Sequence, residues 1–210
     1  MRARIDHVIL AGPDLGELQE YAEAHLGIRP QPGGSHPGIG TRNALVGLGG
    51  RSYLELVAPD PDQPTPPHPR PFRVDELTEP TLTGWALRAS GLAERVARAR
   101  EKGVELGDPF RMSRTRPDGT TLSWELTGFD TDLGGMQPFL IDWGDTPHPS
   151  EGLPGVQLVS VRVRHPEAAR LSSVLEALEA PRGAIQLRTM GDSVRLSLVV
   201  ATGDGEVILG

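Results

Sequence analysis

The stretch ARIDHVILAGPDL, residues 3–15, alternates apolar with other side chains and carries one imidazole near its centre. This alternation is typical of a half-buried strand and predicts one over residues 4–11. The strand would have two faces, with Ile5, His7 and Ile9 on one and Asp6, Val8 and Leu10 on the other. A single histidine on an otherwise apolar face is a candidate functional group.

The order of elements that starts here recurs along the chain. Asp14 is placed to cap a helix over residues 15–26, and strands follow over 41–48 and 52–58. A second copy is predicted as a strand over 83–89, a helix over 91–102 and strands over 104–115, 120–127 and 136–143. A third copy is predicted as a strand over 158–164, a helix over 166–180 and strands over 185–189, 193–200 and 206–209. Such a recurrence indicates internal duplication.

The repeat predicts both the fold class and the domain organisation. We expect an α+β fold of repeated βαβββ modules, in which two modules pair into a ligand-binding cup and a third module follows. The cup domain takes residues 1–150, with modules at 1–60 and 80–146 and a proline-rich linker at 59–72. The third βαβββ module takes residues 153–210.

The composition narrows the classes of function. A formal net charge of -7 argues against nucleic-acid binding, because that binding depends on neutralising phosphates. The absence of cysteine excludes disulfides, a thiol nucleophile and a cysteine-based zinc site. No segment approaches the roughly 18 apolar residues of a membrane span, and the start MRARIDHV has no signal-peptide pattern. We therefore expect a cytoplasmic protein that binds neither nucleic acid nor membrane.

Glu55 is the second candidate functional residue. The segment YLELVA, residues 53–58, is otherwise apolar, and an unpaired carboxylate in a buried strand is costly. If the first and last strands of a module lie side by side, Glu55 and His7 become cross-strand neighbours with Cβ atoms about 4.5–5.5 Å apart. Such a pair can share a divalent metal or act as an acid and a base. The alternative is structural, with the histidine satisfied by Asp6 or a backbone carbonyl.

Four segments resemble a known family: HVILAGPDL (7–15), HPGIGTRNALV (36–46), YLELVAPDP (53–61) and PFLIDWG (138–144). They are similar to the glyoxalase-like branch of the vicinal-oxygen-chelate superfamily, which includes glyoxalases, bleomycin-resistance proteins and ring-cleaving dioxygenases. The resemblance covers residues 4 to about 148. It implies paired modules that form a cup, with metal ligands on the first and last strands of each module.

Carried over to this chain, the resemblance implies His7 as the first metal ligand and Glu55 as both the second ligand and the catalytic group. The second module departs from the pattern, because Trp85 stands where a histidine or glutamine is expected. On its last strand, Asp142 competes with Ile141 for the inward register. Two or three protein ligands would suit Mg2+, Mn2+, Fe2+ or Zn2+, and a cup without metal is the other reading.

Further side chains are candidates for binding a small-molecule ligand. They are Thr41, Asn43, Trp85, Trp124 and Arg116, with Arg114 and Trp143 as neighbours of the same kind. Threonine and asparagine can hydrogen-bond a polar ligand, arginine can pair with a carboxylate or phosphate, and tryptophans can wall an apolar pocket. The alternatives are core packing for the tryptophans and solvation for the arginines. For His36, within HPGIGT, a role in a turn is the favoured reading.

Two functions from different classes remain open. The first is a divalent-metal-dependent lyase, isomerase or dioxygenase that acts on a small vicinal-oxygen substrate. The second is a non-catalytic protein of the bleomycin-resistance type, which sequesters an apolar or aromatic compound. The family includes both classes, so the fold does not decide between them.

The third module needs a packing partner. VSVRVR (159–164) and VRLSLVV (194–200) each present an apolar face, and a module of about 55 residues buries too little surface to be stable alone. The partner is either the first two modules of the same chain or the same module of a second subunit. The second arrangement, a homodimer, is the favoured one.

Overall fold

The computed structural model describes residues 2–115, 119–129, 131–189 and 191–210. The first repeat comprises β1 (Arg4–Ala11), α1 (Leu15–Leu26), β2 (Gln31–His36), β3 (Thr41–Gly47) and β4 (Tyr53–Pro59). The second comprises β5 (Thr81–Arg88), α2 (Leu92–Glu101), β6 (Phe110–Thr115), β7 (Thr121–Leu126) and β8 (Phe139–Asp142). The third comprises β9 (Gln157–Arg164), α3 (Ala168–Ala177), β10 (Ile185–Arg188), β11 (Arg195–Thr202) and β12 (Gly205–Leu209). Short 3-10 helices are η1 (Pro71–Glu76), η2 (Leu133–Gly135) and η3 (Arg182–Ala184). This element order confirms the predicted α+β fold.

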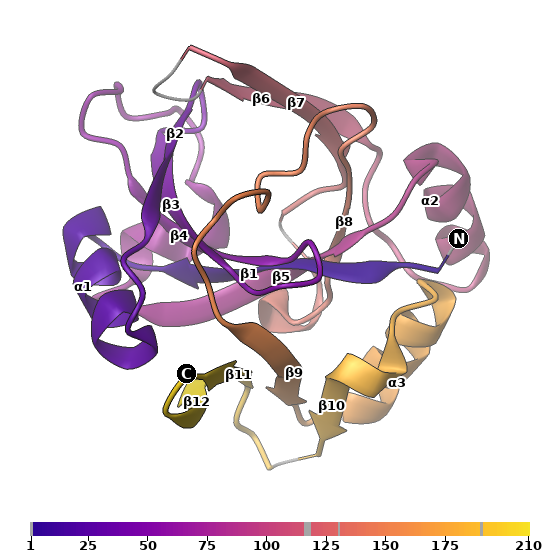
Figure 1. Cartoon of the computed structure of the whole chain (residues 1–210). Helices are drawn as coiled ribbons and strands as arrows, with labels where there is room; N and C mark the ends of the chain where they lie inside the picture. The colour runs from indigo at the N-terminus through magenta and orange to yellow at the C-terminus, as the bar shows by residue number, and fades with distance from the viewer. Residues whose placement is uncertain (1, 116–118, 130, 190) are drawn as a thin grey trace.

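The strands of the first two repeats close into a barrel in the order β1-β4-β3-β2-β6-β7-β8-β5 (Figure 1). In each repeat the first strand pairs in parallel with the last, β1 with β4 and β5 with β8. The two repeats meet where β1 pairs antiparallel with β5, and again where Ser35 of β2 pairs with Thr115 of β6. The predicted cup is therefore a closed ring of strands, with α1 and α2 outside it.

Two of the differences from the predicted strands concern β2 and β6. Gln31–His36, which lies between the helix predicted over 15–26 and the strand predicted over 41–48, forms β2 and completes the ring. The strand predicted over 104–115 begins only at Phe110. Gly107 precedes it with a φ of 72°, which is a turn conformation rather than an extended one.

The third repeat has the predicted order of one strand, one helix and three strands, but its strands are arranged differently. Its sheet has the order β10-β9-β11-β12, so the first strand lies in the interior next to the second and third. In the barrel repeats the first strand lies next to the last. The third repeat thus shares its element order with the others and not its strand order.

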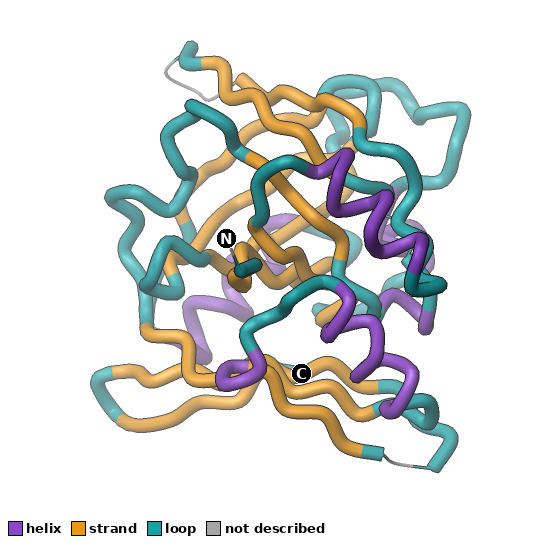
Figure 2. The backbone as a smooth tube through the Cα atoms, turned by 90° about the vertical axis from the view of Figure 1, so that its right-hand side faces the viewer, coloured by secondary structure: helices purple, strands orange, loops and turns teal. Residues whose placement is uncertain are grey.

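The four-stranded sheet packs against the barrel of the same chain (Figures 1 and 2). One continuous core joins Leu18 and Leu87 of the barrel repeats to Leu171 and Leu198 of the third. The backbones also meet, because Val156 and Leu158 donate to the carbonyls of Gly47 and Leu48 at 2.9 and 2.8 Å. The first two repeats of the same chain, the other partner considered from the sequence, therefore cover a face of the third repeat.

The described helices are all too short or too polar to cross a membrane.

Candidate functional site

A pocket of about 510 Å3 lies inside the barrel. One part of its wall is polar: His7, His36, Thr41, Asn43, Tyr53, Glu55 and Arg114. The other part is apolar: Ile39, Pro71, Phe72, Met112, Trp124, Leu126, Phe129, Phe139, Ile141 and Trp143. A small organic molecule with one polar and one apolar end matches this division.

A bulge in β1 determines which side chains enter the barrel. The pairing of β1 with β5 shifts between Ile5 and His7, so the simple alternation predicted for this strand breaks there. Ile5 joins Val8 in the core outside the ring, instead of sharing a face with His7. Asp6 is consequently placed beside His7, and its Oδ1 lies 2.7 Å from His7 Nδ1.

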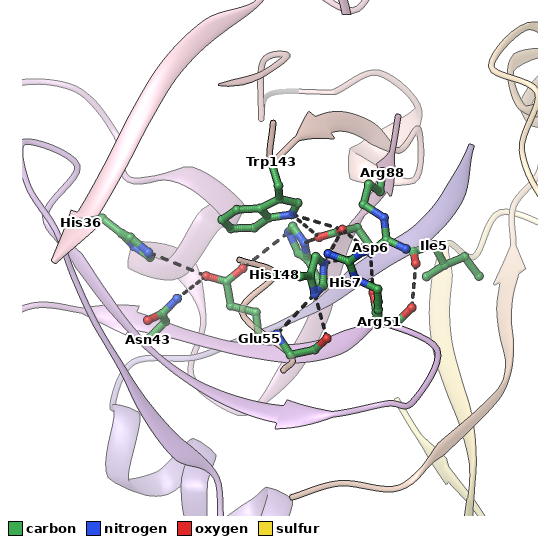
Figure 3. Close-up of polar contacts among 12 residues, drawn as sticks. Ile5, Asp6, His7, His36, Asn43, Arg51, Glu55, Arg88, Trp143 and His148 are labelled. Carbon is green, nitrogen blue, oxygen red and sulfur yellow. Dashed lines mark hydrogen bonds and ion pairs between the residues drawn. The ribbon is translucent and has the colours of Figure 1, made fainter. Parts of the chain in front are cut away.

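His7 and Glu55 face each other across the pocket wall, as predicted from their strands (Figure 3). Nε2 of His7 lies 3.5 Å from Oε2 of Glu55, and the two side chains are only 4 and 11 % exposed. The two residues are diagonal neighbours on adjacent strands, because His7 pairs with Tyr53 and Glu55 pairs with Ile9.

Asp6 controls which nitrogen of His7 carries a proton. Burial raises the pKa of Asp6, but hydrogen bonds from His148 and His7 outweigh it and hold that pKa well below its usual range. A carboxylate only accepts hydrogen bonds, so His7 donates through Nδ1. In the neutral form of the imidazole, Nε2 then directs its lone pair at a carboxylate oxygen of Glu55. Two acceptors at 3.5 Å need a proton or a cation between them.

Asn43 holds Glu55 from the other side. Its Nδ2 donates to Oε1 of Glu55 at 2.6 Å, and its Oδ1 accepts from Nη1 of Arg114 at 2.7 Å. Because Arg114 can only donate, this chain fixes the orientation of the amide. Oε2 of Glu55 remains directed toward His7 and the pocket.

His36 is part of the site, although a role in a turn was the favoured reading. It ends β2, its Nε2 lies 3.8 Å from Oε1 of Glu55, and its Nδ1 lies 2.9 Å from Oγ1 of Thr41. Burial lowers the pKa of His36 to about 4, against an opposing effect of Glu55. The side chain is therefore neutral at pH 7 and has no charge of its own in the pocket.

The low pKa of His36 predicts a loss of stability in mild acid. Between about pH 6.5 and pH 4 the unfolded chain binds a proton at this residue that the folded chain does not, so the free energy of unfolding falls as the pH falls. The loss across that window is up to about 3 kcal/mol. Urea denaturation at pH 7 and pH 4.5 measures it, with His36→Gln as the comparison. The variant should lose less stability than the wild type; an equal loss in both proteins would contradict the assignment.

The predicted tryptophans divide between the pocket and the core. Trp124 and Trp143 line the pocket with ring centroids 5.1 Å apart. Trp85 does not line this pocket: it is fully buried in the core outside the ring and donates to the carbonyl of Met136 at 2.9 Å. The residue of β5 that pairs with His7 is Ala86 instead.

The other predicted residues can be placed in turn. Thr41 and Asn43 line the pocket, as expected. Asp142 points away from it and accepts from the backbone of Gly91 and Gly144, while its competitor Ile141 faces inward. Arg116 lies outside the described residues.

His148 and Arg88 complete a buried network around Asp6 that the sequence analysis missed. His148 Nε2 lies 2.9 Å from Oδ2 of Asp6, Trp143 Nε1 lies 3.3 Å from it and Arg88 Nη1 lies 3.4 Å from it. No local pattern marks His148, which follows β8 and reaches back 142 residues along the chain. Several apolar lining residues were not predicted either, and one of them, Phe72, lies in the segment that was read as a linker.

The polar wall has donors for a divalent cation. Within the described part of the chain, no group of three or more His, Cys, Asp or Glu side chains is arranged to hold a metal ion. His7 Nε2 and Glu55 Oε2 nevertheless face each other at 3.5 Å, and Asp6 supports the histidine as carboxylates commonly do behind metal ligands. One nitrogen and one oxygen fit a cation whose remaining positions go to water or substrate oxygens.

Comparisons with known proteins address the family and the fold. Residues 5–179 match the family described as glyoxalase-like domain. No curated protein matches the sequence. A hypothetical protein from Staphylococcus aureus is 17% identical with a TM-score of 0.70, over 92% of this chain and 88% of that one. A mutant of 4-hydroxymandelate synthase from Streptomyces coelicolor is 16% identical with a TM-score of 0.52, over 99% of this chain and 62% of that one. At these identities, the two structures show a shared fold.

Proposed function

Because this chain belongs to the glyoxalase-like domain family, we propose that it is a divalent-metal-dependent enzyme that acts on a small molecule with two neighbouring oxygens. The family match confirms the resemblance found in the four sequence segments. The observation that carries the proposal is the pair His7 Nε2 and Glu55 Oε2, which face one another at 3.5 Å inside the barrel. A cation between them would satisfy both acceptors.

His7 and Glu55 would hold the cation, and neutral His36 lies on the far side of the same carboxylate. When bound, such a cation would withdraw charge from two neighbouring substrate oxygens and favour proton loss from the carbon beside them. Asp6 keeps the proton of His7 on Nδ1, so Nε2 stays available. Asn43 orients Glu55, which we assign as the carboxylate that also takes the substrate proton.

A non-catalytic binding protein is the second candidate, and the aromatic wall favours it. The rings of Phe72, Phe129 and Phe139 lie 5.4 to 6.1 Å apart, and the pair Trp124 and Trp143 adds to the same apolar surface. A surface of this kind would hold an aromatic compound with or without a cation. A measurement of metal binding distinguishes the metal-dependent enzyme from the non-catalytic binding protein.

Glu55→Gln is expected to abolish metal binding while leaving the fold intact. The amide oxygen can still accept from Asn43, and the new amide N–H group can donate to His7 Nε2, so the free energy of unfolding should change by less than about 1 kcal/mol. The affinity for Mn2+ should fall about 100-fold or more, since loss of outer-shell partners alone costs 10–100-fold. Mn2+ titration followed by electron paramagnetic resonance, with a thermal melt of each protein, measures both quantities.

His7→Ala and His25→Ala form the matched pair for this experiment. His25 is an exposed histidine on α1 and contacts the carbonyl of Tyr21, far from the pocket. We expect His7→Ala to lose Mn2+ binding and His25→Ala to keep it. A wild type that binds no Mn2+, or equal Mn2+ binding by both histidine variants, would refute the metal-dependent function and favour the binding protein.

A further inference from the structure

Arg114 brings a positive charge into the barrel next to an apolar surface. It lies on β6, lines the pocket and is only 3% exposed. Met112, which also lines the pocket, lies two residues before it, and the strand neighbour of Arg114 is the buried Leu122. A guanidinium remains charged when it is buried, so Arg114 gives this part of the pocket a positive charge beside its apolar wall.

Gly33 gives Arg114 the room to occupy this position. A Cβ atom at Gly33 would lie 2.0 Å from Oδ1 of Asn43 and 2.3 Å from Nη1 of Arg114. The backbone of Gly33 does not have a positive φ, so the space and not the conformation requires glycine. Glycine at position 33 therefore leaves the space in which the amide of Asn43 and the guanidinium of Arg114 meet.

Asn43 separates the charge of Arg114 from that of Glu55. Its Oδ1 accepts from Arg114 and its Nδ2 donates to Glu55, so one amide lies between the cation and the anion. A ligand anion at the guanidinium would then be held apart from the Glu55 carboxylate. The planar fork of arginine donors matches the two oxygens of a carboxylate.

We propose that the pocket binds an organic acid, with its carboxylate on Arg114 and its aromatic or alkyl body against Trp124 and the phenylalanine rings. This inference rests on the proposed function, because it gives the substrate class of the same pocket. The neighbouring oxygens of such an acid would extend from Arg114 toward His7 and Glu55 along the polar wall.

Benzoate and benzamide test the proposal, because they share a ring and differ in charge. Trp124 and Trp143 line the pocket, so tryptophan fluorescence can follow both titrations. The wild type should bind benzoate at least about tenfold more tightly than benzamide, since a charged hydrogen bond contributes more than a neutral one. Arg114→Gln should lose that preference and keep its affinity for benzamide within about twofold.

Gly33→Ala provides a second variant should Arg114→Gln fail to fold. It keeps every charge and should weaken benzoate binding by displacing the pair of Asn43 and Arg114. Gly203→Ala is its control, because a Cβ at Gly203 would meet nothing within 4 Å. A wild type that does not prefer benzoate, or a folded Arg114→Gln variant that binds benzoate as tightly as the wild type, overturns the proposal.

Mn2+ titration of the same proteins distinguishes this inference from the metal-dependent function on which it rests. Arg114→Gln keeps His7 and Glu55, although Asn43 loses the arginine that fixes its amide, so its Mn2+ affinity should fall by no more than about tenfold. If the wild type prefers benzoate but binds no Mn2+, the metal-dependent function fails and the acid-binding pocket stands. If Mn2+ binds and benzoate is not preferred, the substrate class fails and the metal site stands.

Discussion

A chain that ends at residue 150 is expected to lose cooperative unfolding and to aggregate, although it keeps every strand of the barrel. The boundary that we propose near residues 150–153 divides two units that share one core. Removal of the third repeat uncovers the apolar side chains of the barrel repeats that pack on Leu171 and Leu198, both fully buried. Each large apolar side chain that is exposed costs about 1.5–3 kcal/mol. A few of them exceed the 5–15 kcal/mol that typically stabilises a folded protein.

Circular dichroism melts and size-exclusion chromatography with light scattering test this expectation. The full chain should melt in a single transition, and the shortened chain should not. Addition of a separate peptide of residues 153–210 serves as the control, because it restores the core without restoring the chain connection. A shortened chain that remains monomeric and melts cooperatively would show that the third repeat is an independent unit.

Asp6→Asn is expected to destabilise the protein by about 3–5 kcal/mol, the usual cost of removing one partner from a buried charge network. Asp6 is fully buried and is approached by His7, His148, Trp143 and Arg88. The substitution preserves the volume and removes the charge. The new amide NH2 group of the asparagine is itself a donor. It would face N–H groups whose hydrogen bonds the carboxylate accepts in the wild type. His7 loses the group that fixes its tautomer, so Mn2+ affinity should fall about 10–100-fold as well.

Asp108→Asn is the matched control for this substitution. Asp108 is an exposed carboxylate that pairs with Arg100 at 3.4 Å on the surface, so its loss should change the free energy of unfolding by no more than about 0.5 kcal/mol. Urea denaturation at pH 7 measures both variants. Similar values for the two would mean that the network around Asp6 contributes little to stability.

The repeat in the sequence predicts most of the barrel, because its signal is local. Alternation identifies each strand, and the recurrence of strand, helix and strands identifies the modules. The approach of His7 to Glu55 follows from one topological rule, that the first and last strands of a module are neighbours. The strand order of the third repeat could not be predicted in this way. Alternation shows which face of β9 is buried and does not show which strands lie beside it.

The errors at the site come from shifts in register. The register shift between Ile5 and His7 in the pairing of β1 with β5 moves the alignment by a residue, so Ala86 and not Trp85 lies opposite His7. The same irregularity places Asp6 next to His7, where strict alternation separates them. A bulge has no signature in a run of alternating residues. The partner that then buries Asp6, His148, lies in a turn region without any motif.

The distance along the chain between Asp6 and His148 has a consequence for synthesis. Asp6 leaves the ribosome before its partner His148, which follows 142 residues later, an interval of roughly 7–28 seconds at 5–20 residues per second. During that time a carboxylate in the middle of an otherwise apolar strand has to stay in water. β1 also pairs only with strands that are made after it, β4 and β5. The network around Asp6 can therefore be completed only after residue 148 has been made, which makes it one of the slow, long-range contacts of the fold.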